Sequence, residues 1–213
     1  MKRAAECGRV AAAMAVGIGL GASAAGLLAM NAPDGLRDEG AIPSATAATT
    51  ARASTVRPSP PVEVRGPGGW RAPVVPVAVA RDGALALPED DRNGGWWALG
   101  APAGAAQGTT LLAGHVDTRA GPGTFAALHS LPLRARVEVI GANGRTYPYT
   151  VVARRTYTQA SLPPDLFTRD SDHRLALITC AGAYNPASHS YDRNLVLYAT
   201  PAPQESRSTT RRR

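Results

Sequence analysis

The chain has 213 residues and a formal net charge of +7, which leaves room for one ordinary domain with appended segments. The charge divides into +2 in residues 1–30, 0 in 31–69, +2 in 70–201 and +3 in 202–213. Most of the excess lies at the two ends, and no basic stripe with interleaved aromatic residues runs through the middle. The sequence therefore argues against a nucleic acid as partner.

The first thirty residues predict a membrane anchor. Residues 1–9 carry three basic side chains, and residues 10–30 (VAAAMAVGIGLGASAAGLLAM) carry no charge. Such a stretch is long enough to cross a bilayer as a helix, and the basic residues before it favour a cytoplasmic amino terminus. We expect a single-pass protein of the cell membrane whose remaining residues are extracytoplasmic. A cleaved signal peptide is the alternative, because the stretch is only weakly apolar and small residues stand at 22–25.

The chain has two cysteines, Cys7 and Cys180. The predicted anchor places them on opposite sides of the membrane, so they do not form a disulfide with each other. Cys180 is then a free thiol in an exported domain, where oxidation threatens it.

Residues 31–69 predict a disordered spacer. They are rich in Ala, Thr, Ser and Pro and show no helical or strand periodicity. Alternating apolar patterns begin near Trp70 and stop near Thr200. We expect one folded domain at 70–201, followed by a basic disordered tail at 202–213.

The folded part reads as all-β. Short β-branched and apolar runs bounded by Gly, Pro and Asn predict strands at 73–80, 84–87, 109–114, 136–140, 147–157, 174–179 and 194–199. Asn143-Gly144 predicts a tight hairpin with both residues at positive φ. Helical patterns are short, at 123–130 and 161–168. The expected fold is a closed β-barrel of seven to eight strands with short connecting helices.

Two reactive side chains end apolar strands. Cys180 follows RLALIT and His115 follows TTLLAG, so the two can meet at one rim of the barrel as an activated nucleophile. The alternatives are a buried packing role for Cys180 and a hydrogen bond from His115 to a loop carbonyl. The other histidines, His129, His173 and His189, lie in helical or loop contexts and are given no catalytic role.

Arg193 opens the last strand. In an active site its guanidinium is a fixed multi-donor for a developing oxyanion. The alternative is an exposed ion pair with an acid such as Asp192 or Asp117.

Three segments, in this order along the chain, resemble the His, Cys and Arg segments of bacterial sortases, most closely class F and next class E: LAGHVDT (112–118), LITCAG (177–182) and SYDRNLVLYA (190–199). The resemblance implies the eight-stranded sortase barrel and assigns catalytic roles to His115, Cys180 and Arg193. Many members of this subgroup place the arginine directly after Ser-Tyr, where this chain has Asp192. Because a shift of one residue reverses the face of a strand, the direction of Arg193 stays open.

The resemblance also implies a reaction. In such a cysteine transpeptidase the Cys180 thiolate attacks the threonine carbonyl of an LPxTG-like sorting signal on a surface protein. The His115 imidazolium protonates the leaving amine, and Arg193 orients substrate or stabilises the oxyanion. A cell-wall precursor type of amine then takes the acyl group from the thioacyl enzyme. The reaction needs no cofactor, and no metal ligands stand at plausible spacing.

The resemblance implies a substrate groove beside the nucleophile. The connection at 158–172 is its expected wall, with Leu162, Pro163 and Leu166 as apolar contacts. Thr179, next to Cys180, is expected to complete the site, together with the connection that precedes Arg193.

Two other functions compete with this one. An L,D-transpeptidase or a wall amidase is opposed by the order of the residues, because His115 precedes Cys180. A non-catalytic, membrane-anchored extracytoplasmic binding module with a structural Cys180 stays open, and the accessibility of the thiol distinguishes the two.

Overall fold

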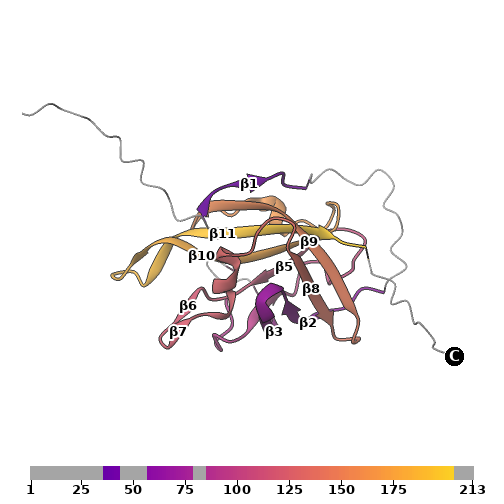
Figure 1. Ribbon diagram of the computed structural model, residues 1–213, viewed down its shortest axis with the longest axis horizontal. Helices are drawn as coiled ribbons and strands as arrows, with labels where there is room; N and C mark the ends of the chain where they lie inside the picture. Colours follow the sequence, from indigo (N-terminus) through magenta and orange to yellow (C-terminus); the bar gives the residue numbers. More distant parts are fainter. Residues whose placement is uncertain (1–35, 44–56, 79–84, 204–213) are drawn as a thin grey trace, which may run out of the picture. The chain divides into compact units, whose positions relative to one another are not determined.

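The computed structural model describes residues 36–43, 57–78 and 85–203 (Figure 1). The predicted anchor at 10–30 and the tail from 204 onward lie outside the described residues. No helix within the three described ranges is long and apolar enough to cross a lipid bilayer.

The described ranges contain short 3-10 helices and many strands. The 3-10 helices are η2 (Pro67–Gly69), η3 (Thr124–His129) and η4 (Pro164–Phe167). The strands are β1 (Glu39–Gly40), β2 (Pro61–Arg65), β3 (Arg71–Val77), β4 (Gly94–Trp97), β5 (Thr109–Ala113), β6 (Asp117–Thr118), β7 (Gly121–Pro122), β8 (Arg136–Gly141), β9 (Thr146–Thr158), β10 (Arg174–Asn185) and β11 (Ser190–Pro201).

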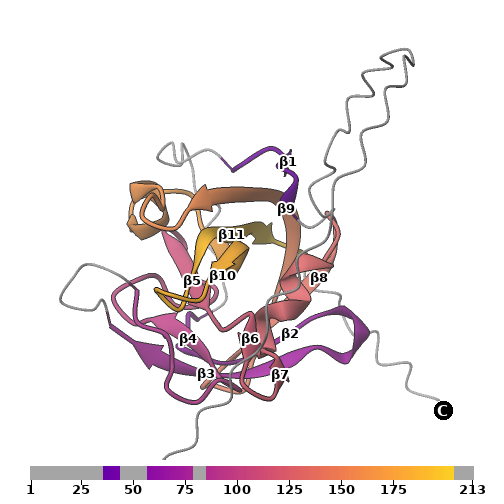
Figure 2. The same ribbon diagram turned by 90° about the vertical axis from the view of Figure 1, so that its left-hand side faces the viewer.

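Eight of these strands form a closed barrel in the order β9-β11-β10-β5-β4-β3-β2-β8. The barrel closes because β8 pairs with β2 on one side and with β9 on the other. The neighbours β10–β5 and β3–β4 are parallel, and the remaining pairs in the ring are antiparallel. Figure 2 shows the strands arranged around a common interior. The predicted all-β barrel of seven to eight strands with short connecting helices is confirmed.

Two apolar clusters lie on opposite faces of β10 and β11. The interior cluster draws on all eight barrel strands and includes Leu175, Leu177, Leu195 and Leu197. The outer cluster includes the alternate residues Ala176, Ile178, Val196 and Tyr198, together with Leu166 of η4. Because β10 is buried on both faces, the run LALI (175–178) is continuously apolar instead of alternating.

The barrel begins earlier in the chain than the sequence analysis expected. Strand β2 lies inside the predicted spacer at 31–69, yet it pairs with both β3 and β8. Its Val64 is fully buried, while Pro61 opens the strand beside a register shift, where a missing N–H is tolerated. The proline-rich run around this strand concealed it from an analysis of composition.

A second part of the predicted spacer also contacts the barrel. Strand β1 pairs antiparallel with the second half of β9, beyond the stretch of β9 that pairs with β8. Arg155 on β9 donates hydrogen bonds to the main-chain oxygens of Glu39 and Gly40 at 2.6 and 2.8 Å. Residues 36–43 thus belong to the folded domain, although their composition suggested a disordered spacer.

The expected strand at 84–87 is replaced by another. Residues 85–87 lie outside the named strands, and β4 occupies the place between β3 and β5. Its Gly94 and Gly95 leave no room for a side chain, since an added Cβ would come within 2.9 Å of Phe125 and of Val77, respectively. Glycines that allow this close packing resemble turn residues in a sequence, which explains why β4 was missed.

The β8–β9 hairpin forms where it was predicted but with a different turn. Gly144 has φ +74°, whereas Asn143 is not at positive φ. The N–H of Gly141 donates to Arg145 O at 2.9 Å across a three-residue loop. A loop of this length needs positive φ only at its glycine, so the expectation for Asn143 was wrong.

Candidate active site

The parallel pairing of β5 with β10 brings His115 and Cys180 to the same end of the barrel. Ala113 is opposite Ile178, and the N–H of Gly114 donates to Ile178 O at 3.1 Å. One residue further, Thr179 Oγ1 donates to Gly114 O at 2.9 Å. His115 and Cys180 are the next residues after these two pairs, so both lie at the same end of the β5–β10 pair.

A groove of about 540 Å³ opens beside Cys180 on the outer face of the barrel. The ends of β5 and β10 form its floor with Ala113, Ile178 and Thr179. Leu85 and Leu87, from the connection before β4, line one wall. The β9–β10 connection lines the other with Gln159, Ala160, Leu162 and Phe167.

The predicted substrate contacts divide into two groups. Leu162 and Thr179 line the groove. Pro163 instead caps η4, and Leu166 is fully buried in the outer cluster. Because the tight turn of η4 directs consecutive side chains to different sides, Phe167 lines the groove while Leu166 fills the core beneath it.

The groove contains residues that the sequence analysis missed. Leu85 and Leu87 come from a segment expected to be a strand, Gln159 directly follows β9, and Asn194 lies within β11. Of these residues only Asn194 stands in a motif segment, where it follows Arg193. Only the register of the strands reveals that they share one surface with Cys180.

The thiol of Cys180 is partly buried, and burial raises its pKa, assisted by the nearby negative charge of Asp117 on β6. The hydroxyl of Tyr191 donates to Oδ2 of the same carboxylate. That hydrogen bond, more than burial, raises the pKa of Tyr191 to about 12. Burial and the charge of Asp117 both favour the neutral thiol form of Cys180 over the thiolate.

His115 makes a contact outside the pair. Its Nε2 lies 3.1 Å from the carbonyl oxygen of Pro88, which follows the groove wall formed by Leu85 and Leu87. The loop-carbonyl contact considered as an alternative in the sequence analysis is therefore present. The ring must release Pro88 before its Nε2 can serve Cys180 or a substrate.

Strand alternation separates Arg193 from the groove face. Asn194 is opposite Cys180 in the β10–β11 register and lines the groove, whereas Arg193 is opposite Ala181. Arg193 shares its face with Leu195, whose side chain lies in the interior cluster, and it is exposed at the end of the barrel. Its role in the site remains a prediction, and Asn194 becomes a second candidate for that role.

Asp192 fills the position where the subgroup resembled by this chain has its arginine. Its Oδ1 accepts a hydrogen bond from the N–H of Ala183 at 2.7 Å. Gly182 has φ +84°, and a Cβ at this glycine would lie 2.0 Å from that oxygen. The bulge between β10 and β11 therefore requires glycine opposite Asp192.

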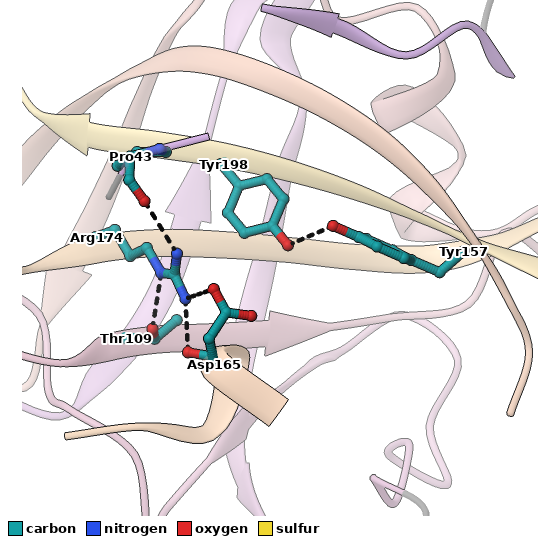
Figure 3. Close-up of polar contacts among 6 residues, drawn as sticks. All are labelled: Pro43, Thr109, Tyr157, Asp165, Arg174 and Tyr198. Carbon is teal, nitrogen blue, oxygen red and sulfur yellow. Dashed lines mark hydrogen bonds and ion pairs between the residues drawn. The ribbon is translucent and has the colours of Figure 1, made fainter. Parts of the chain in front are cut away.

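A buried arginine connects η4, which carries the groove residue Phe167, to the barrel strands (Figure 3). Arg174 is 1% exposed, and it donates to Thr109 Oγ1 and to Asp165 Oδ2, both at 3.0 Å. It also donates to Pro43 O at 3.4 Å and lies over the ring of Tyr198. One side chain thus joins η4, the amino-terminal segment and the two parallel strands.

A comparison with protein families identifies the class of protein. Residues 68–202, well over half of the chain, match the family model described as "Sortase domain". The chain therefore belongs to the sortase family, as its three motif segments indicated. No curated protein matches the chain.

Solved structures share the fold. Sortase A from Corynebacterium diphtheriae superposes with a TM-score of 0.54 and 15% identity, over 70% of this chain and 64% of that one. The complex of Streptococcus agalactiae sortase C1 with MTSET superposes with a TM-score of 0.53 and 16% identity, over 78% of this chain and 80% of that one. Streptococcus pneumoniae sortase C superposes with a TM-score of 0.52 and 15% identity, again over 78% of this chain and 80% of that one. Identities this low establish the fold alone.

Proposed function

We propose that this chain is a class F type of sortase that cleaves an LPxTG-like sorting signal and transfers the acyl part to an amine. The observation that carries the proposal is the convergence of Cys180 and His115 at the ends of two paired parallel strands, beside a groove. Sortases generally are cysteine transpeptidases that act on surface proteins with sorting signals.

In the first half-reaction the thiolate of Cys180 attacks the carbonyl carbon of the signal's threonine. A carbon–sulfur bond forms, the threonine–glycine amide bond breaks, and the imidazolium of His115 gives its proton to the leaving amine. His115 first leaves the carbonyl of Pro88. In the second half-reaction an amine of cell-wall precursor type attacks the thioacyl carbon, a carbon–nitrogen bond forms and the carbon–sulfur bond breaks. The neutral imidazole of His115 takes the proton that the amine loses, which regenerates the thiolate and the imidazolium.

The elevated pKa of Cys180 gives this chemistry a distinct pH requirement. Catalysis needs a deprotonated thiol together with a protonated imidazole, and burial with Asp117 disfavours the thiolate. Turnover therefore depends on the protonation of the pair as a unit.

The groove suits a short apolar peptide. Leu87, Leu162 and Phe167 offer apolar contacts on its two walls, fitting the leucine and proline of the signal. Asn194, opposite Cys180, places a polar side chain in the groove, where its Nδ2 donates to Gln159 O at 3.1 Å and is the group that a peptide backbone would meet. The resemblance assigns the oxyanion to Arg193, whereas the strand register supports Asn194.

The sequence supports a location outside the cytoplasm, held to the membrane by residues 10–30. Such an anchor fits an enzyme whose substrates pass through the membrane and whose acceptor is a wall precursor. Fractionation of cells with a protease-accessibility assay tests this location, since an uncleaved anchor leaves residues 85–203 on the outer side.

A thioacyl adduct is the direct test of the function. The full-length chain is incubated with a panel of LPxTG-like peptides, and mass spectrometry follows the mass added to the peptide that contains Cys180. We expect an adduct equal to the acyl part, released by an added amine. Cys180→Ala is the control and should form none while keeping its fold. An adduct of equal yield in that control, or no adduct from any peptide, contradicts the proposal.

One observation favours the non-catalytic alternative. Cys180 is partly buried and its thiol pKa is raised, as expected of a packing cysteine. Native-state alkylation separates the two functions, because a groove-lining thiol reacts with iodoacetamide at alkaline pH and a packing thiol resists it until the protein unfolds.

A further inference from the structure

His129 lies against the nucleophile's own peptide. It is the last residue of η3, and its Nε2 lies 3.1 Å from the carbonyl oxygen of Cys180. The sequence analysis gave this histidine no catalytic role, because nothing in the helical pattern at 123–130 links it to the motif at 177–182. The contact joins a third connection of the barrel to the residue that performs the chemistry.

The direction of the Cys180 carbonyl explains why a side chain is needed there. Successive carbonyls of a strand point to alternate neighbours, and Ile178 O accepts from the N–H of Gly114, the residue that follows β5. The carbonyl of Cys180, two residues on, therefore points to the same side. In an uninterrupted parallel ladder its donor would be the N–H of Val116. Strand β5 ends at Ala113, and His129 takes that place.

The helix that carries His129 is fixed at its base. Buried Arg154 on β9 donates to the main-chain oxygen of His129 at 3.0 Å and to those of Leu128 and Leu131. Leu128 itself is fully buried in the interior cluster. The imidazole therefore reaches Cys180 from a rigid support, as a positioning group requires.

We propose that His129 is a positioning residue that replaces β5 as the hydrogen-bond donor to the Cys180 peptide. The replacement lets the chain leave the ladder after Gly114, so that His115 is not held in strand geometry, while the peptide of Cys180 stays fixed. The inference rests on the proposed transpeptidase function and deepens it. A displaced nucleophile of about 1 Å costs roughly a hundred-fold in rate, so a lost peptide contact has a measurable effect.

Three substitutions in the full-length chain separate positioning from folding. His129→Leu removes the donor, His129→Asn retains an amide that is too short, and His129→Gln retains one of similar reach. We expect the first two to lower kcat for an LPxTG-like peptide by about ten- to a hundred-fold with KM within a few-fold, and His129→Gln to recover most of the rate. Melting temperatures are measured for each variant.

His173 provides a matched control at the other end of the same two strands. Its Nδ1 lies 3.0 Å from Gly108 O, and its Nε2 lies 2.9 Å from the hydroxyl of Tyr149. His173→Leu therefore removes a comparable contact between an imidazole and a carbonyl, far from the groove. We expect it to lower the melting temperature while leaving kcat within about two-fold of the parent.

The outcomes are distinct. Unchanged kcat in His129→Leu overturns the inference, as does a loss that His173→Leu reproduces at equal destabilisation. Equal losses of kcat in His129→Gln and His129→Leu also overturn the inference, because a hydrogen-bond donor of similar reach would then fail to replace the imidazole. If the parent turns over no peptide, the proposed function fails instead. The rate of Cys180 alkylation by iodoacetamide then still tests the positioning, and it should change in His129→Leu and not in His129→Gln.

Discussion

At the scale of single residues, burial and a neighbouring charge act together on the thiol of Cys180. Burial raises the pKa of the thiol most, and the carboxylate of Asp117 raises it further, because a thiolate next to an anion is disfavoured. The same carboxylate accepts a hydrogen bond from Tyr191. The negative charge of Asp117 thus acts on both Cys180 and Tyr191.

Asp117→Asn should lower the pKa of the Cys180 thiol. Removal of the negative charge stabilises the thiolate, so the midpoint of the pH profile of iodoacetamide alkylation should move to lower pH. Tyr191→Phe is the control, since it removes the hydrogen bond but leaves the carboxylate charge in place. A profile that stays fixed or moves to higher pH in Asp117→Asn contradicts this explanation.

The neighbours Arg193 and Asn194 can be distinguished by substitution. The register directs Asn194 into the groove and Arg193 to the other face, so we expect Asn194→Ala to lower peptide turnover more than Arg193→Lys does. Arg193→Lys keeps the charge but loses the planar fork of donors. A strong loss of turnover in Arg193→Lys, at an unchanged melting temperature, would place the guanidinium at the groove. The measurement is kcat/KM for both variants, with thermal unfolding beside it.

At the scale of elements, the groove depends on connections that are tied to the barrel. Helix η4 carries Phe167 on the groove side and Leu166 on the core side, and Arg174 links η4 to β5 through Asp165 and Thr109. A buried guanidinium is stabilised only when its donors are paired, which these partners achieve. The wall of the groove is therefore as fixed as the barrel that supports it.

Arg174→Met should loosen this wall. The substitution leaves Asp165 and Thr109 without their partner, and we expect a loss of about 1–3 kcal/mol in the free energy of unfolding. Since η4 positions groove contacts and not the nucleophile, KM for peptide should rise more than kcat falls. Arg145→Met, at an exposed position in the β8–β9 hairpin, is the control. A loss of stability with unchanged KM would show that the groove does not depend on Arg174.

At the scale of the whole domain, closure of the barrel decides where the chain can be shortened. Strand β2 joins β3 to β8, so the barrel has no free edge at this point. The amino-terminal segment at 36–43, in contrast, adds β1 to the outside of a barrel that is already closed. We therefore expect folding of the barrel to require β2, whereas residues 36–43 add stability to a barrel that can close without them.

Two shortened chains test this difference. A chain that begins at residue 57 keeps β2 and should fold cooperatively, with a lower melting temperature because it lacks Pro43 and β1. A chain that begins at residue 70 exposes the edges of β3 and β8 and should not show a cooperative thermal transition. Near-ultraviolet circular dichroism and calorimetry follow both. Cooperative unfolding of the second chain would show that β2 is dispensable, as its composition first suggested.

Several strands and the principal residues of the site could be predicted from the sequence because they leave local signals. The runs TTLLAG and RLALIT are apolar enough to mark β5 and β10, and each ends in a reactive side chain. Strand β4 could not be predicted, because its glycines are selected by contacts with Phe125 and Val77. Strand β2 was concealed by the prolines around it, and its pairing partners lie far away in sequence.

The sequence by itself determined the family, the all-β class and the position of Cys180 and His115 just after apolar strand runs, since motifs and strand ends are local properties of the chain. Only the tertiary structure decided which side chains share the groove. The faces of Arg193 and Asn194 depend on the register between β10 and β11, and the contact of His129 with Cys180 depends on where β5 leaves the ladder. Register and the end of a ladder arise from pairing between distant strands, and local sequence patterns do not encode such pairing.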